Sequence, residues 1–276
     1  MKLKAFAKIN FSLRVFEKRP DGFHSLESIM QSVSLHDIVT VTPIASGIEL
    51  SCDDPTIPIN EQNTCYKAAK LYIEQVDSRE SKMEHRGVRI QIEKRIPIAA
   101  GLAGGSADAA AVLFGLNRLS NHDYRLSTIE LLDIAAHVGS DVPFCLTGGT
   151  CLVKGRGEIV EKLDAWAQQY YIIVNPGIHI SAKWAYDEFD KLNIVAPEEI
   201  KNDLEPAVVS RYPIIMEIKE KLIELGCSQA QMSGSGSTVF GITRDHETAQ
   251  HIYDQIKNKY GFCCIAQNMN QGIEVI

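Results

Sequence analysis

The stretch PIAAGLAGGSADAAA, Pro97 to Ala111, decides the fold because most of its positions carry almost no side chain. It contains three glycines and seven alanines. The segment before it, GVRIQIEKRIP, alternates apolar and polar residues and predicts a strand that ends at Pro97. The segment ADAAAVLFGLNRL has high helical propensity, with Ser106 as the expected N-cap and Asp108 in the first turn. The glycines therefore stand between a strand and the beginning of a helix.

Three interpretations compete for these small residues. A dinucleotide-binding turn needs G-x-G-x-x-G and an acidic residue about 20 residues later, whereas this chain has G-L-A-G-G-S and no such acid. Close packing of a helix on a sheet explains Ala109 to Ala111, but it does not require glycines before the helix. Glycines at Gly101, Gly104 and Gly105 leave the first helical amides uncrowded, which is the geometry that binds phosphate without net positive charge. We therefore expect a phosphate-binding loop.

The composition of the chain restricts which kinds of molecule the protein can bind. The 276 residues can bury a sizeable core and predict two domains. A net charge of −7 argues against nucleic-acid and anionic-membrane partners, which need clustered Lys and Arg. The longest apolar runs are shorter than the roughly 18 residues of a membrane span, and Lys8 and Asn10 interrupt any N-terminal secretory signal. We expect a cytoplasmic protein.

The cysteines do not indicate a metal site. The chain has seven of them, and their spacing matches no common metal-binding pattern. Cys263 and Cys264 are adjacent, and others stand in apolar contexts such as VPFCL and GGTCL. Such positions are typical of buried, reduced thiols. We expect no metal-ligating residues.

Periodicity along the rest of the chain predicts mixed helices and strands. AKINFSLRV alternates with period 2, which predicts a half-buried strand with Lys8, Asn10 and Ser12 on one face. Further strands are expected over 27–44, 47–54, 150–163, 170–177 and 229–243, and helices over 63–76, 127–138, 182–192, 213–226 and 246–261. A charged turn near Gly155 suggests a boundary between domains 1–155 and 156–276. The alternation predicts an α+β sandwich.

Three motifs together resemble a known family. Pro97, Gly101, Leu102 and the run GGSA from Gly104 to Ala107 are similar to the phosphate loop P-x-x-x-G-L-x-G-S-S-A of the GHMP kinases, the galactose, homoserine, mevalonate and phosphomevalonate kinase superfamily. AKINF at Ala7 to Phe11 and MSGSGSTVFG at Met232 to Gly241 stand in the order expected for that family. The resemblance spans nearly the whole chain. It implies a two-domain fold with an active-site cleft between the domains.

Two further motifs narrow the resemblance. RPDGFH at Arg19 to His24 and GSDVPF at Gly139 to Phe144 are similar to a branch of the family that phosphorylates an alcohol carrying a cytidine diphosphate group. Departures from the branch pattern are Phe6 for proline, Phe23 for tyrosine, and alanine for glycine at Ala100 and Ala103. The remaining glycines still supply unusual backbone angles. The resemblance implies ATP, with Mg²⁺, as the co-substrate.

The resemblance also assigns catalytic roles. Asp141 matches the catalytic base, and its alternative role is the N-cap of a short helix. Lys8 matches the lysine that keeps this base ionised and stabilises the developing alkoxide, and its alternative is a solvated strand lysine.

Binding roles follow from the same match. The residues assigned to the acceptor alcohol and its cytosine are Asn10, Phe23, His24 and Tyr186. Those assigned to ATP are Asn63, Lys94, Pro97, Gly101, Leu102, Ala103, Gly104, Gly105, Ser106 and Ala107. Ser106 would hydrogen-bond a phosphate oxygen or lie near Mg²⁺, or cap its own helix. Asn63 has a plain helix cap as its alternative, Lys94 a surface charge, and Phe23 a buried anchor for its turn.

Two other functions stay open at this point. One is a GHMP kinase for another small alcohol, and the other is a catalytically silent relative that senses a metabolite. The aromatic pair Phe23 and His24 argues against the first, and the presence of both Lys8 and Asp141 argues against the second. We expect a monomer or a weak homodimer.

Overall fold

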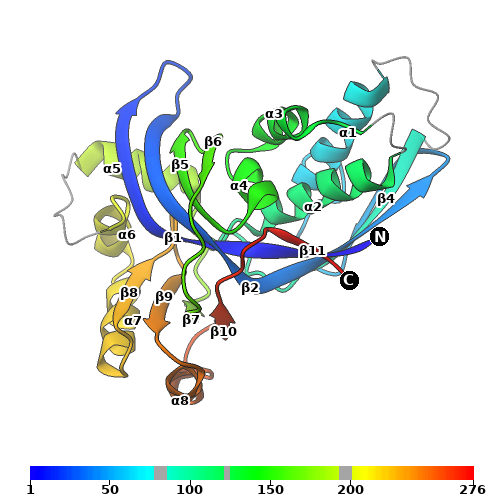
Figure 1. Cartoon of the computed structure of the whole chain (residues 1–276). Helices are drawn as coiled ribbons and strands as arrows, with labels where there is room; N and C mark the ends of the chain where they lie inside the picture. Colours follow the sequence, from blue (N-terminus) through cyan, green and yellow to red (C-terminus); the bar gives the residue numbers. More distant parts are fainter. Residues whose placement is uncertain (78–85, 121–124, 193–200) are drawn as a thin grey trace.

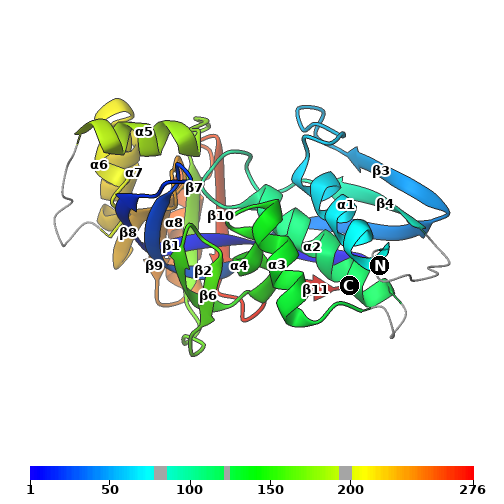
Figure 2. The ribbon, with the colours of Figure 1, turned by 90° about the horizontal axis from the view of Figure 1, so that it is seen from above.

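The computed structural model describes residues 1–77, 86–120, 125–192 and 201–276. These residues form two β-sheets with helices packed on them (Figure 1). The larger sheet lies in the half that carries both chain termini, and the smaller sheet lies at the other end of the molecule (Figures 1 and 2). This arrangement confirms the predicted α+β class.

The long hairpin of β1 (Lys2–Lys18) and β2 (His24–Ile44) is the spine of the larger sheet. The prediction of a half-buried first strand was wrong, because every residue from Ala5 to Asn10 is buried. Ala7 and Ile9 pack toward the second sheet, while Lys8 and Asn10 point into a cavity on the opposite face. Polar residues at alternate positions here line a site rather than meet solvent.

The remaining strands complete a sheet with the order β11-β1-β2-β4-β3, and β5 and β6 extend it from β2. Their bounds are β3 (Ser46–Cys52), β4 (Arg86–Glu93), β5 (Thr150–Gly155), β6 (Ile159–Lys162) and β11 (Ile273–Val275). Helices α1 (Thr64–Asp77), α2 (Gly104–Leu119), α3 (Thr128–Val138) and α4 (Val142–Thr147) pack with this sheet in one apolar core. Ser127 and Glu130 form a capping box that begins α3.

The second sheet has the strand order β10-β7-β9-β8. Its strands are β7 (Tyr170–Asn175), β8 (Gln229–Met232), β9 (Val239–Thr243) and β10 (Phe262–Gln267). Its helices are α5 (Ala182–Leu192), α6 (Glu205–Arg211), α7 (Ile214–Glu224) and α8 (His246–Ile256). Tyr171, Ile173 and Phe240 of this sheet share an apolar cluster with Ala7 and Ile9 of β1. The two sheets are therefore joined through a continuous core.

The predicted division at residue 155 does not coincide with the division between the sheets. Strand β6 pairs with β5 across the turn that contains Gly155, and β11 at the end of the chain pairs with β1. A hairpin and a returning terminal strand keep both of these segments in the first sheet. Local turn chemistry marks the turn at Gly155 but carries no information about which sheet the chain enters next.

All seven cysteines are free thiols. Cys65, Cys145, Cys151 and Cys227 are buried, whereas Cys52, Cys263 and Cys264 are partly exposed. The prediction of buried thiols is thus correct for four positions. In the described ranges, none of the helices has the length and apolar character needed to cross a bilayer.

Candidate active site

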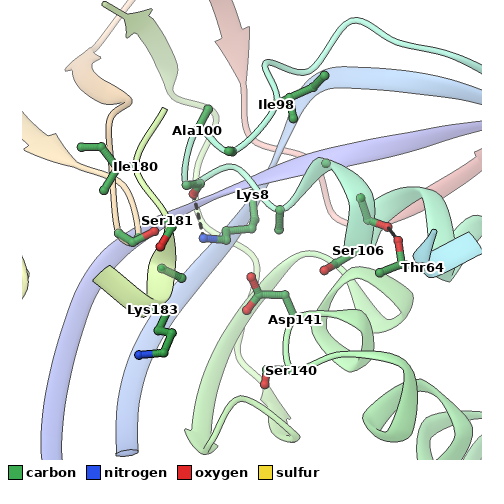
Figure 3. A pocket seen from close by; sticks show the side chains of 18 of the residues that line it. Lys8, Thr64, Ile98, Ala100, Ser106, Ser140, Asp141, Ile180, Ser181 and Lys183 are labelled. Carbon is green, nitrogen blue, oxygen red and sulfur yellow. Dashed lines mark hydrogen bonds between the residues drawn. The ribbon is translucent and has the colours of Figure 1, made fainter. Parts of the chain in front are cut away.

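A cavity of about 980 Å³ lies between the two halves of the molecule. The Pro97–Ser106 stretch lines one end, α5 and the β1–β2 turn line the other, and Lys8 and Asp141 lie between them (Figure 3). All five segments singled out in the sequence contribute residues to this cavity. It is large enough for two small-molecule substrates side by side.

The glycine stretch leads into α2 through an N-cap residue that the sequence did not predict. The helix begins at Gly104, and Ala103 occupies the N-cap position with a left-handed backbone at φ 57° and no side-chain cap bond. The prediction of Ser106 as N-cap was therefore wrong, since Ser106 lies in the first turn and faces the cavity. Asp108 likewise lies beyond the first turn, and it is buried. Gly104 and Gly105 place no side chain of their own at the first helical amides, which favours phosphate binding.

The MSGSGSTVFG motif packs directly on the glycine stretch. A Cβ atom at Gly101, which has φ 76°, would lie 2.2 Å from the carbonyl oxygen of Ser233. The Ser233 hydroxyl donates to the Gly101 carbonyl at 3.0 Å, and the Thr238 amide donates to the Ala100 carbonyl at 3.3 Å. Gly101 is therefore required for the close approach of two loops. The MSGSGS segment is a tight turn between β8 and β9, as predicted, and Gly234 within it lines the cavity.

Lys8 is buried and held from two sides. Its ammonium donates to Asn10 Oδ1 at 2.7 Å and to the Gly101 carbonyl at 2.8 Å (Figure 3). Only 3% of the residue is exposed, so the alternative of a solvated strand lysine is excluded. Burial lowers the pKa of Lys8, and the charge of Asp141 opposes that shift. Lys8 is thus fixed at the junction of β1 and the glycine stretch.

Asp141 precedes α4, where a helix cap was the alternative role. Its carboxylate makes no cap hydrogen bond. Instead it lies on the wall of the cavity, facing the Lys8 ammonium (Figure 3). The Asp141 charge also raises the pKa of the Tyr186 hydroxyl, although burial is the larger cause of that shift. A carboxylate that is not used by its own helix is available to a substrate hydroxyl.

Three aromatic residues line the far end of the cavity. Phe23 is 49% exposed, so the alternative of a buried turn anchor is wrong, and the Arg156 guanidinium lies 5.5 Å from its ring centre. His24 is buried and stacks on Tyr186, with ring centres 5.5 Å apart and planes 20° apart. His24 Nδ1 donates to the Phe16 carbonyl at 2.9 Å. These rings come from the β1–β2 turn and from α5.

Both ring nitrogens of His24 have polar neighbours. Nδ1 donates to the Phe16 carbonyl, and Nε2 lies 3.0 Å from Asp190 Oδ1. Asp190 belongs to α5, so this contact joins the start of β2 to that helix. A ligand that hydrogen-bonds Nε2 would compete with Asp190.

Lys94 and Asn63 line the opposite end near the glycine stretch. The Lys94 side chain is only 7% exposed and pairs with Asp37 and Asp108, so its alternative as a surface charge is wrong. Asn63 does cap α1: its Oδ1 accepts from the Cys65 amide at 2.8 Å, and its Nδ2 donates to the Pro58 carbonyl at 2.8 Å. Its predicted contact with adenine stays a prediction.

Two of the predicted ATP-binding side chains do not line the cavity. Leu102 packs with Ala7 and Ile9 in the core between the sheets, and Ala107 packs in the core under α2. Alternating residues of a tight loop point to opposite sides, so part of any phosphate motif serves packing. The Leu102 carbonyl still accepts from the Lys8 amide at 3.1 Å.

Sequence reasoning missed several residues of the cavity. Arg156, Ser181, Lys183 and Asp187 line its aromatic end. Arg156 lies in the turn between β5 and β6, and the charged run KGRGE was the one local signal that could have pointed to it. Ser181 and Lys183 begin α5, and Figure 3 shows both at the cavity opposite Asp141. All of these residues are far from Phe23 in the sequence, and only the fold brings them to the same end of the cavity.

Comparison with known proteins agrees with this geometry. The family model of the GHMP kinases N terminal domain matches residues 63–149, and that of the GHMP kinases C terminal domain matches residues 187–261. The chain belongs to the GHMP kinase family. It is a small-molecule kinase with two domains and a cavity between them.

Several relatives of this GHMP kinase share one name. The 4-diphosphocytidyl-2-C-methyl-D-erythritol kinase of Clostridium botulinum strain Eklund 17B is 42% identical, over 94% of this chain and 97% of that protein. The enzyme of that name from Acetivibrio thermocellus is 41% identical, over 97% and 98%. A crystal structure of 4-(cytidine 5'-diphospho)-2C-methyl-D-erythritol kinase superposes with a TM-score of 0.81 at 30% identity, covering 97% of this chain and 99% of that one.

Proposed function

We propose that this GHMP kinase transfers the γ-phosphoryl group of ATP to the 2-hydroxyl of 4-diphosphocytidyl-2-C-methyl-D-erythritol, a step of the non-mevalonate route to isoprenoid precursors. The observation that carries the proposal is the single cavity in which Lys8 and Asp141 lie between a glycine loop and an aromatic end. The names of relatives that align with this chain over nearly its full length support the same substrate.

The chemistry needs a base, a cation and a fixed phosphoryl donor. The Asp141 carboxylate would accept the proton of the 2-hydroxyl, while the hydroxyl oxygen forms a bond to the γ-phosphorus. The bond between that phosphorus and the β,γ-bridging oxygen breaks, and ADP leaves. Lys8, already fixed by Asn10 and the Gly101 carbonyl, would stabilise the negative charge that develops on the attacking oxygen.

The aromatic end suits a cytosine base. Phe23 would stack on the face of the base from its exposed position, and Tyr186 would lie on the opposite side. His24 would hydrogen-bond the polar edge of the base through Nε2, which lies 3.0 Å from Asp190 Oδ1 in the free protein. Phe23 lacks a phenolic hydroxyl, so it supplies stacking alone, a contact worth roughly 1 to 3 kcal/mol per base.

The glycine end suits the ATP phosphates. Gly104, Gly105 and Ser106 open α2 with amides that face the cavity, and Pro97 and Ala103 border the same loop. Asn63 and Lys94 would lie near the adenosine part of ATP. Mg²⁺ would enter bound to the ATP phosphates, because Mg²⁺ in kinases is held through substrate phosphates and few protein ligands. It would neutralise part of the triphosphate charge.

The proposal also implies where the kinase acts and which partners it has. A kinase of this kind acts in the cytoplasm on a small-molecule substrate, without nucleic-acid or membrane partners. The proposed form is a monomer or a weak homodimer.

A substrate panel tests the proposed function. ADP release from ATP is measured with the purified protein and, in turn, the cytidyl alcohol, mevalonate, homoserine and galactose. Fast release with the cytidyl alcohol alone supports the proposal. Preference for another alcohol would identify a different GHMP kinase, and binding of the cytidyl alcohol without ADP release would identify a silent metabolite sensor.

A further inference from the structure

Three buried charged side chains meet beside the glycine loop. The Lys94 ammonium donates to Asp37 Oδ2 and, at 2.8 Å, to Asp108 Oδ2. The exposed fractions of the Lys94, Asp37 and Asp108 side chains are 7%, 0% and 4%. Charges this deeply buried are retained only where they are paired, and breaking such a pair is strongly destabilising. The proposed mechanism uses neither carboxylate.

The three residues connect both ends of the loop to one strand. Lys94 follows β4 and precedes the loop, Asp108 lies in α2 just after the loop, and Asp37 belongs to β2. Asp37 Oδ1 also accepts from the Arg95 amide at 2.5 Å and from the Ile96 amide at 2.8 Å. One carboxylate therefore holds three consecutive residues at the entry to the loop. Through Lys94 it also holds the helix at the exit.

The loop between these two ends has a backbone that needs such support. Ala99 and Ala103 adopt left-handed angles, with φ values of 50° and 57°, although both carry a Cβ atom. Residues other than glycine rarely adopt this conformation and keep it only where the surroundings impose it. Local propensity alone would let the loop relax, and the amides of Gly104 and Gly105 would then turn away from the cavity.

Burial acts on the charges of this cluster. It raises the pKa of Asp108, against the opposing effect of Lys94. Asp108 Oδ1 is buried and has no hydrogen-bond partner among the described residues. The Lys94 ammonium is the group that connects Asp108 to Asp37.

We propose that Asp37, Lys94 and Asp108 form a clamp that holds the loop over residues 95–103 in the shape that accepts ATP. Asp37 is then a positioning residue for ATP, although its side chain does not line the cavity. The inference rests on the proposed binding of ATP at the glycine end. It does not depend on which alcohol receives the phosphate.

The test compares Asp37→Ala with Asp37→Asn. The alanine variant removes the acceptor of both loop amides and of Lys94, and losing hydrogen bonds to a charged group predicts an ATP KM at least about tenfold higher. The asparagine variant keeps an oxygen acceptor, and Lys94 stays paired with Asp108, so its ATP KM should rise less than about threefold. The KM of the cytidyl alcohol should stay within about twofold in both.

Hydrogen exchange supplies a readout that does not need catalysis. Amides of residues 95–103 should exchange faster in Asp37→Ala than in the wild type or in Asp37→Asn, and saturating ATP should restore part of the protection. Asp203→Ala is the matched control. It removes a carboxylate that binds Arg14 at 2.7 Å and the Val15 amide at 2.8 Å, away from the loop. Exchange at 95–103 should not change in this control.

Several outcomes would overturn the clamp. They are an unchanged ATP KM in Asp37→Ala, equal increases for both substrates, or loop exchange no faster than in Asp203→Ala. If Asp37→Ala does not fold, Asp108→Ala cuts only the helix side, and the same ATP KM and exchange criteria decide. Direct titration with ATP separates the two proposals: a wild type that binds ATP but phosphorylates another alcohol refutes the proposed acceptor and leaves the clamp test intact.

Discussion

The two ends of the cavity are built on opposite principles. At the glycine end the chain carries few side chains, and the backbone of Gly104 and Gly105 faces the space where phosphates would lie. At the far end the chain places large rings on the cavity wall, namely Phe23, His24 and Tyr186. The glycine end offers partial charges on amides, whereas the aromatic end offers polarisable surface and the imidazole of His24.

This difference teaches how one fold can serve many acceptors. Every kinase of the family must bind the same triphosphate, so the glycine end is a compact motif of backbone geometry. The acceptor end depends on side chains from two separated segments, the β1–β2 turn and α5, and these can change without disturbing the loop. Lys8 and Asp141 lie between the ends, where they would serve both substrates in the proposed reaction. Variants should therefore separate into three groups.

Asp141→Asn gives the largest expected effect. The substitution keeps shape and removes the base, so kcat should fall on the order of 10²- to 10⁴-fold. Both KM values should stay within a few fold, because Asp141 belongs to neither end. Steady-state kinetics of the folded variant check this. A variant with nearly wild-type kcat would remove Asp141 from the mechanism.

Gly105→Val should act on ATP alone. An added Cβ at Gly105 meets only the Thr64 hydroxyl, at 3.5 Å, so the free protein has room for a side chain. The valine would occupy the space proposed for phosphate, and the ATP KM should rise about tenfold or more. Gly105→Ala should give a smaller increase in the same direction. An unchanged ATP KM in a folded Gly105→Val protein would mean that the glycine serves packing only.

Phe23→Ala should act on the alcohol alone. Loss of base stacking predicts a KM for the cytidyl alcohol about tenfold higher, with the ATP KM unchanged. Phe23→Tyr should be tolerated, because the ring remains. Phe16→Ala is the matched control, since Phe16 belongs to the same hairpin, is 50% exposed and does not line the cavity. Equal losses for the two alanine variants would place the cytosine site elsewhere.

Asp108 predicts a smaller effect, on stability rather than turnover. Because burial raises its pKa to about 8, the folded protein keeps a proton that the unfolded chain releases near pH 4. Stability from this group therefore falls as pH rises from about 4 to about 8 and then levels off.

Asp108→Asn should remove that slope. Urea unfolding of both proteins across this pH range measures the difference. The charged and titratable groups that act on Asp108 are Lys94, Asp37, Cys65, Cys52 and Cys145, and burial keeps the three thiols protonated by raising their pKa values. A wild type that gains stability relative to the variant as pH rises would show an ionised Asp108 instead.

The glycine end could be predicted from sequence because its signals are local. A strand, three glycines and an alanine-rich helix follow one another in the chain, and their backbone preferences are set by immediate neighbours. Even here the helix begins three residues earlier than an N-cap at Ser106 predicts, because the N-cap is Ala103. Ala103 adopts a left-handed backbone angle, which alanine rarely takes, so the sequence does not predict it. The contacts around Ala103 impose that angle.

The remaining features depend on tertiary partners. A surface charge was the alternative for Lys94 because Asp37 stands 57 residues away and α2 folds back only in three dimensions. Arg156 reaches Phe23 through the pairing of β5 with β2, and β11 returns to β1 from the far end of the chain. Such juxtapositions follow from topology, which no local periodicity encodes.

The most direct test of the account is the position of the new phosphate. The purified protein is incubated with ATP and 4-diphosphocytidyl-2-C-methyl-D-erythritol, ADP is quantified, and the product is analysed by ³¹P and ¹³C NMR. The account predicts one phosphate ester for each ADP, with phosphorus coupling to the carbon that carries the 2-C-methyl group. ADP without an ester, or an ester at another hydroxyl, would contradict it.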